Sequence, residues 1–123
     1  MLLIPVHIGP SKIHGLGCFT DIDIKKGETV WVYDERIDLH IPKADVPAFP
    51  KPIQDYLNMY AYEEVYNGAH VMVLCGDHSK HMNHSGDPNL LEGEGGTNVA
   101  GRDIAAGEEL TCDYTSFDLS VKF

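Results

Sequence analysis

Residues 81–90 read HMNHSGDPNL and gather two histidines and several small polar side chains around one glycine and one proline. Three kinds of site compete to explain this composition: a metal site, a turn that holds the fold together, and a pocket for a small cofactor. Asp87, Pro88 and Asn89 are typical turn residues, and Ser85 or Asp87 can accept backbone N–H bonds. The turn explains the end of the stretch but leaves its histidines unexplained.

The histidines of this region follow a regular spacing, with His78, His81 and His84 at every third position and Asp77 and Asp87 nearby. Imidazole is the commonest transition-metal ligand in proteins. Three residues at this spacing drift around a helix, however, and no cysteine pair accompanies them. We therefore predict no metal and keep a metal-dependent enzyme only as a third hypothesis.

The whole chain limits the possible functions further. With 123 residues, 43% of them hydrophobic, it can bury one core, so we expect a single domain over residues 1–123. Nineteen acidic against nine basic residues give a formal net charge of −10. This charge repels phosphate backbones and attracts Lys- and Arg-rich peptides. We expect a basic protein or peptide as partner and no direct contact with nucleic acid.

Nothing in the sequence predicts export or a membrane span. The N-terminal run of residues 1–6 lacks a positively charged start and is broken by Pro5, and no apolar stretch approaches the roughly 18 residues that a span requires. Cys18, Cys75 and Cys112 are odd in number and far apart, which favours neither a disulfide framework nor a CxxC metal site. We expect an intracellular protein.

Short β-prone runs separated by turn residues predict a mainly β protein. The predicted strands are Leu2–Val6, Cys18–Thr20, Thr29–Tyr33, Ile37–Ile41 and His70–Cys75. Residues 52–60 have Pro at a first helical position and apolar side chains at helical spacing, which predicts a short helix. The preceding segment, residues 41–52, holds four prolines and is predicted to be an irregular surface excursion.

Two short patterns remain ambiguous when each is taken alone. Residues 23–30 and 103–110 share the pattern D-I-x-x-G-E-x-[VL], which indicates two turns that lead into strands, either independent or duplicated. Residues 14–19, HGLGCF, lack the third glycine and the helix of a dinucleotide-binding fingerprint. Their glycines indicate either a tight bend or a backbone that a ligand can approach closely.

The combination and the order of these motifs are more specific than any one of them. HGLGCF, D-I-x-x-G-E-x-V, NHSGDPN and GEELTCDY together resemble the SET-domain family of protein lysine methyltransferases, whose members typically read NHSCxPN and GEELTxDY. The resemblance extends from about residue 7 to residue 114. It implies a mainly β SET-domain fold of small curved sheets with one or two short helices. It also implies a C-terminal segment tucked under a preceding loop in a knot-like arrangement, an exception to the rule against threading.

The resemblance assigns roles to individual residues and implies S-adenosyl-L-methionine as cofactor. Asn83 and His84 match the residues that hold its amino-acid moiety and its adenine, and Lys80 matches a basic residue near its carboxylate. The other wall of the pocket matches the backbone of His14, Gly15 and Leu16. Tyr114 matches the catalytic tyrosine where cofactor and substrate lysine meet. Tyr60 and Cys112 are expected in the substrate channel, with Tyr62 and Tyr66 as further candidates.

The sequence departs from the family at three places. Gly86 replaces the usual cysteine of NHSCxPN, and no Cys-rich segment follows Tyr114, so the zinc cluster of many relatives is not expected. Only nine residues follow Tyr114. Phe117 or Asp118 is expected to cover the adenine or the channel, with Phe117 the better candidate for stacking, or a second subunit of a homodimer completes the site instead. Cys112 stands where relatives have Phe or Tyr, which leaves the number of methyl groups transferred open.

Methyl transfer from a sulfonium to an amine is an in-line displacement, so alignment of the reacting atoms supplies much of the acceleration. The expected function is S-adenosylmethionine-dependent methylation of a lysine in a basic protein segment, with histones as candidate substrates. The alternative is a catalytically silent SET-like binding module.

Overall fold

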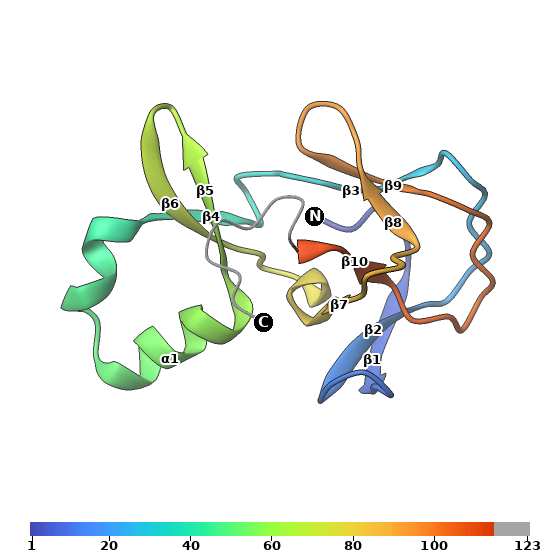
Figure 1. The fold of residues 1–123 in the computed structure, drawn as a ribbon, viewed down its shortest axis with the longest axis horizontal. Coiled ribbons are helices and arrows are strands. Elements are labelled where there is room, and N and C mark those ends of the chain that lie inside the picture. Colours follow the sequence, from blue (N-terminus) through green and yellow to red (C-terminus); the bar gives the residue numbers. More distant parts are fainter. Residues whose placement is uncertain (115–123) are drawn as a thin grey trace.

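The computed structural model describes residues 1–114, which form ten short strands, one α-helix and two 3-10 turns (Figure 1). In chain order these elements are β1 (Val6–Pro10), β2 (Leu16–Thr20), β3 (Thr29–Val32), β4 (Leu39–Pro42), η1 (Lys43–Ala48), α1 (Lys51–Tyr60), β5 (Tyr62–Tyr66), β6 (Ala69–Leu74), η2 (His78–His81), β7 (Asn83–His84), β8 (Leu90–Glu92), β9 (Thr97–Ala100) and β10 (Thr111–Cys112). The predicted mainly β fold with few short helices is confirmed.

Strand pairing divides the fold into four small sheets rather than one large sheet. Three are antiparallel, with the strand orders β1-β2, β3-β9-β8 and β4-β6-β5, and the fourth is the parallel pair β10-β7. The sheet β4-β6-β5 lies with η1 and α1 on one side of the molecule, and the other antiparallel sheets lie on the opposite side (Figure 1). The pair β7 and β10 lies between them, so the NHSGDPN and GEELTCDY motifs meet in the middle of the molecule.

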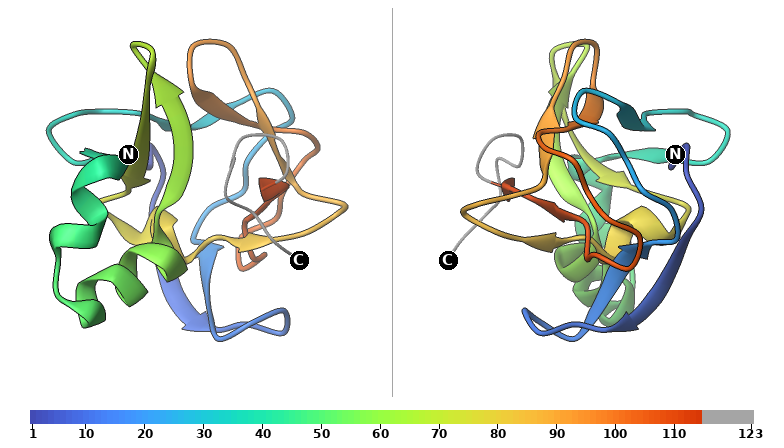
Figure 2. Two further views of the ribbon diagram at one scale, coloured as in Figure 1. Left: turned by 60° about the vertical axis from the view of Figure 1, so that its left-hand side comes forward. Right: turned by 90° about the vertical axis from the view of Figure 1, so that its right-hand side faces the viewer.

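The hairpins β5–β6 and β8–β9 belong to different sheets, yet their turns project from the same end of the molecule in every view (Figures 1 and 2). Positive φ angles at Asn67 and Gly68 form the first turn, and those at Gly95 and Gly96 form the second. The two hairpins therefore lie next to each other at this end of the molecule.

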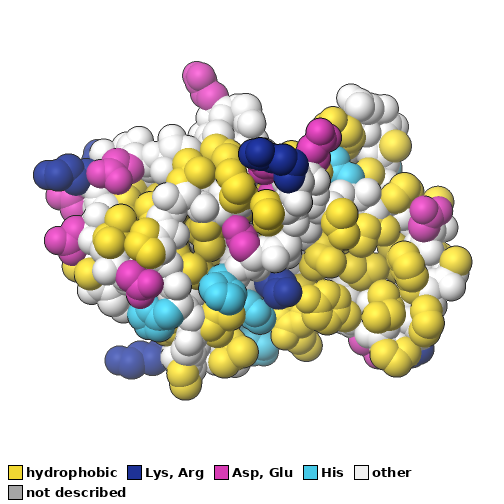
Figure 3. Space-filling view, turned by 180° about the vertical axis from the view of Figure 1, so that it is seen from behind, with side chains coloured by type: hydrophobic (Ala, Val, Ile, Leu, Met, Phe, Trp, Pro, Cys, Tyr) yellow, Lys and Arg dark blue, Asp and Glu magenta, His cyan; other side chains and the backbone are white. Residues whose placement is uncertain are grey.

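Two separate hydrophobic clusters form the core, one on each side of the molecule. The larger cluster contains Cys18, Ile24, Val30, Met82, Leu90, Ala100, Ile104, Leu110 and Cys112. The smaller one joins Leu57 of α1 to Ala61 and Met72. Hydrophobic side chains also gather on the surface over η1 and α1 (Figure 3). Ile53 and Met59 of α1 are exposed. Among residues 1–114, no helix is long and apolar enough to span a membrane.

The repeated D-I-x-x-G-E pattern forms two turns that pair with each other. Ile24 and Ile104 exchange backbone hydrogen bonds of 2.8 Å in both directions. Gly27 and Gly107 adopt φ angles of 90° and 91°, a left-handed region that glycine reaches without strain. The two turns are thus related by an approximate twofold axis through the Ile24–Ile104 pair.

Several boundaries predicted from the sequence are wrong. The strand predicted at Leu2–Val6 is interrupted: Leu2 forms an isolated antiparallel bridge with Trp31 of β3, the Leu3 N–H donates to the Val30 carbonyl at 2.8 Å, and β1 begins only at Val6. The strand predicted at Ile37–Ile41 begins at Leu39, because the Asp38 carboxylate accepts the Asp34 N–H at 3.0 Å and closes a turn.

Two further segments also differ from the prediction. The strand into which the turn of residues 103–110 leads, β10, covers only Thr111–Cys112, since its partner β7 is two residues long. The proline-rich excursion forms the 3-10 turn η1 on the surface, with no buried residue.

Candidate active site

A cavity of about 140 Å³ opens between the two hairpins and the end of α1. Its walls come from segments far apart in the sequence: Trp31, Tyr33, Met59, Tyr60, Ala61, Tyr62, Glu64, Cys75, Ser79, Lys80, Met82, Glu92, Gly96, Thr97, Asn98, Cys112 and Tyr114. Four residues predicted from the sequence, Tyr60, Lys80, Cys112 and Tyr114, line this one cavity. Tyr62 lines it too, whereas Tyr66 packs against His40 at a tilt, with ring centroids 4.3 Å apart, and is not among the lining residues.

The pairing of β7 with β10 brings Tyr114 into the cavity wall. Cys112 pairs with His84, and the Tyr114 N–H donates to His84 Nδ1 at 3.1 Å. The Tyr114 hydroxyl donates to the backbone carbonyl of Met82. Its position is therefore set by two residues that flank Asn83, about thirty residues earlier in the chain.

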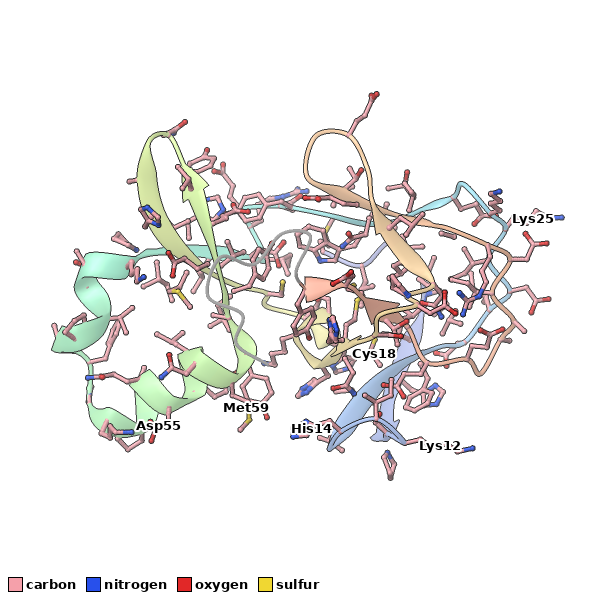
Figure 4. All side chains as sticks on the ribbon, viewed as in Figure 1. Lys12, His14, Cys18, Lys25, Asp55 and Met59 are labelled. Carbon is pink, nitrogen blue, oxygen red and sulfur yellow. The ribbon has the colours of Figure 1, made fainter. Side chains whose placement is uncertain are left out.

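Asn83 connects β7 to the turn between β1 and β2. Its side-chain nitrogen donates to the carbonyl oxygens of His14 and Leu16 at 3.0 and 3.1 Å. Gly15 has a φ of 48°, so a residue with a Cβ is disfavoured at the bend between those two carbonyls. His14 lies at the end of the hairpin (Figure 4). The structure thus brings together the predicted cofactor residues His14, Gly15, Leu16 and Asn83, with His84 adjacent to them.

Because the nitrogen of the Asn83 amide faces these acceptors, the orientation of the amide follows from the hydrogen-bond network. No residue among 1–114 donates a hydrogen bond to Asn83 Oδ1. This oxygen is an available acceptor beside the loop.

Lys80 turns toward α1. Its ammonium nitrogen donates to the Tyr56 hydroxyl at 2.9 Å and lies 5.7 Å from the centre of the Tyr56 ring. Tyr60 packs against both Tyr56 and His81, at centroid distances of 4.8 and 5.3 Å. An aromatic cluster at the end of α1 therefore supports this side of the cavity.

Buried neutral groups form part of the cavity lining. Burial raises the pKa of the Cys112 thiol to about 12 and that of the Cys75 thiol to about 11, and burial also raises the pKa of Tyr62. These groups stay protonated at neutral pH. Glu64, which is half-buried, and Glu92, which is exposed, line the same cavity.

The three regularly spaced histidines do not converge. His81 packs on Tyr60 and His84 on Tyr114. In the described part of the chain, no group of three or more His, Cys, Asp or Glu side chains is arranged to hold a metal ion. The hypothesis of a metal-dependent enzyme therefore has no geometric support there, and the predictions for Phe117 and Asp118 lie outside the described residues.

Several residues of the site escaped the sequence analysis. Trp31, Met59 and Glu92 line the cavity but lie in runs that look like ordinary strand or helix, so no local signal marks them. Glu109 and Ser11 contact Asn83, and only the tertiary structure brings them together.

Comparisons with known proteins agree with this geometry. The family model of the SET domain matches residues 15–115. Among solved structures, Polycomb Repressive Complex 2 of Chaetomium thermophilum bound to GSK126 superposes with a TM-score of 0.72 at 24% identity, over 95% of this chain and 16% of that chain. The same complex bound to S-adenosylmethionine gives a TM-score of 0.69 at 21% identity, again over 95% and 16%.

A Plasmodium falciparum protein described as a candidate histone methyltransferase gives a TM-score of 0.62 at 23% identity, over 92% of this chain and 95% of that chain. The comparison with curated proteins finds no match. At these identities the solved structures show only the shared fold. The family model shows the family, because its match begins at Gly15 in the loop between β1 and β2 and includes Tyr114. The chain belongs to the SET-domain family.

Proposed function

We propose that this chain transfers a methyl group from S-adenosylmethionine to a lysine side chain in a basic protein segment. The observation that carries the proposal is the position of Tyr114, whose hydroxyl bonds the Met82 carbonyl in the wall of the cavity. Membership of the SET-domain family supports the reaction class.

The residues present fit the charges of S-adenosylmethionine, which carries a sulfonium, an ammonium and a carboxylate. Acceptors for the two cationic groups are available at Met82 O and at Asn83 Oδ1, and Lys80 supplies a cation in the same segment. When bound, the cofactor supplies an electrophilic methyl group on a positively charged sulfur.

The neutral, largely apolar cavity suits the aliphatic arm of a lysine. A lysine ammonium, whose pKa is about 10.4 in water, loses its proton to solvent more readily when burial and a nearby cation disfavour its charge. Tyr114 Oη and Met82 O can then accept hydrogen bonds from the N–H groups of the neutral amine and so orient its lone pair.

The open side of the cavity favours a cationic segment. Glu64 and Glu92 line it from the two hairpins, and the chain as a whole carries a formal charge of −10. Trp31 is 5% exposed, and its indole N–H has no hydrogen-bond partner among residues 1–114. A backbone carbonyl of a bound segment would satisfy this donor.

The test is transfer of a labelled methyl group to core histones and to lysate proteins, followed by identification of the modified lysine by mass spectrometry. Tyr114→Phe removes one hydroxyl from the reacting centre, and we expect turnover to fall by about 100-fold or more. Circular dichroism and affinity for S-adenosylhomocysteine should stay close to those of the wild type.

Equal turnover in the two proteins would contradict the role of Tyr114. Binding of S-adenosylhomocysteine without any transfer would instead favour the silent binding module. A homodimer that completes the site and an intracellular location stay predictions.

A further inference from the structure

The paired turns provide an internal comparison for one acidic residue of the site. In each turn the Glu of the D-I-x-x-G-E pattern closes its own turn: Glu28 accepts the Lys25 N–H at 3.2 Å, and Glu108 accepts the Ala105 N–H at 3.0 Å. The next position differs, because it is Thr29 in the first turn and Glu109 in the second. An acid at this position is therefore not needed to build the turn.

Glu109 contacts the loop between β1 and β2 instead. Its carboxylate accepts the Ser11 hydroxyl at 2.8 and 2.9 Å and the Asn83 side-chain N–H at 2.9 Å. The Ser11 oxygen in turn accepts the backbone N–H groups of Ile13 and His14 at 2.9 and 3.3 Å. The Glu109 carboxylate is thus linked to the loop directly through Ser11 and indirectly through Asn83, which donates to two carbonyl groups of the loop.

Gly17 makes this contact sterically possible. A Cβ at Gly17 would lie 2.5 Å from Glu109 Oε2 and 2.8 Å from its Cδ. The close approach that HGLG indicated at this glycine is therefore made by the chain's own carboxylate. Gly15 allows the left-handed backbone of the bend, and Gly17 leaves room for the Glu109 carboxylate.

We propose that Glu109 is a positioning residue that holds Ser11, Asn83 and the loop of residues 11–16 in the conformation that binds the cofactor. This inference rests on the proposed function, because it concerns the same cofactor loop. A loop that is ordered before binding loses less conformational entropy on binding, so its release weakens affinity. Hydrogen bonds to a carboxylate are also stronger than those to a neutral amide.

The experiment measures the dissociation constant of S-adenosylhomocysteine by calorimetry for the wild type, Glu109→Gln and the matched control Glu28→Gln. We expect Glu109→Gln to weaken binding about 10- to 100-fold. The control removes a turn-closing acid of the other repeat, the counterpart of Glu108, and should change binding less than about twofold. Hydrogen exchange at Ile13 and His14 should accelerate in Glu109→Gln alone.

Methylation kinetics provide a second readout. If Glu109 acts through the loop, the KM for S-adenosylmethionine rises while kcat at saturating cofactor stays within about threefold of the wild type. A defect that lowers only the folded fraction would reduce kcat and leave KM unchanged. Such a result would overturn the proposal.

Ser11→Ala keeps the carboxylate and removes one of its donors, so it tests the same network if Glu109→Gln fails to fold. We expect a weakening of about 3- to 10-fold, and less than additive effects when both changes are combined. Wild-type affinity in Ser11→Ala and Glu109→Gln, or equal weakening in Glu28→Gln, would overturn the proposal. Absence of binding by the wild type would refute the proposed function instead.

Discussion

At the scale of single residues, Cys112 determines how much room the cavity leaves beside Tyr114. Its thiol is 5% exposed, lines the cavity and lies 3.7 Å from the Met82 sulfur. Cysteine is smaller than the Phe or Tyr that SET-domain relatives carry here, and its thiol is a weak hydrogen-bond donor. Space for additional methyl groups is therefore expected next to the substrate nitrogen.

We predict that the wild type adds two or three methyl groups and that Cys112→Tyr shifts the products toward monomethyl-lysine. Mass spectrometry of a lysine peptide after exhaustive reaction measures the distribution. Cys18→Ala is a matched control, because Cys18 is fully buried but lies outside the cavity, and its products should match those of the wild type. A wild type that stops at one methyl group would contradict the prediction.

At the scale of elements, Glu63 of β5 ties its sheet to η1. The Lys43 ammonium donates to its carboxylate at 2.8 Å, and the His70 ring lies 2.8 Å from the other oxygen. The hydrogen bond from Lys43, with a further one from His70, lowers the pKa of Glu63 below its ordinary value of 4.5. The charged form is thus the one that stabilises this side of the fold.

We predict that Glu63→Gln lowers the free energy of unfolding by about 1–3 kcal/mol at pH 7. Because the folded-state pKa is depressed, this stabilisation is present above about pH 4.5 and disappears as the pH falls through the folded-state pKa. Urea unfolding of both proteins between pH 3 and 7 tests this. The exposed Glu35→Gln serves as control, and a difference that persists unchanged at pH 3 would contradict the assignment.

At the scale of the whole molecule, Asn89 joins the segment of residues 85–89 to the C-terminal segment. It is 2% exposed, its side chain donates to the Glu109 carbonyl at 2.8 Å and it accepts the Thr111 N–H at 2.9 Å. These bonds fix the strand from which Tyr114 follows.

We predict that Asn89→Ala destabilises the protein by about 2–5 kcal/mol, because it leaves one buried donor and one buried acceptor unpaired. Chemical denaturation measures the change. Asn58→Ala on the exposed face of α1 should stay within about 0.5 kcal/mol of the wild type. A loss of stability for Asn89→Ala no larger than that of the control would show that the contact between residues 85–89 and the C-terminal segment is held by packing alone.

Local pattern predicted the elements better than their limits. The proline at the start of α1 and its helical spacing predicted residues 52–60 to within one residue of the observed start. The strand at Ile37–Ile41 was misplaced because the Asp38 carboxylate captures the Asp34 N–H, and the strand at Leu2–Val6 is interrupted after an isolated bridge between Leu2 and Trp31. The capture of a backbone N–H by a carboxylate depends on the positions of side chains, which strand propensity does not describe.

The sequence alone determined the mainly β class and the family, because ordered motifs such as NHSGDPN and GEELTCDY are local strings. It also indicated the four residues Tyr60, Lys80, Cys112 and Tyr114 that meet in the cavity. Only the tertiary structure decided that the two D-I-x-x-G-E turns pair with each other and that Glu109 reaches Ser11. Those contacts join residues about 80 to 100 positions apart, and a contact between distant residues depends on how the strands cross rather than on any local pattern.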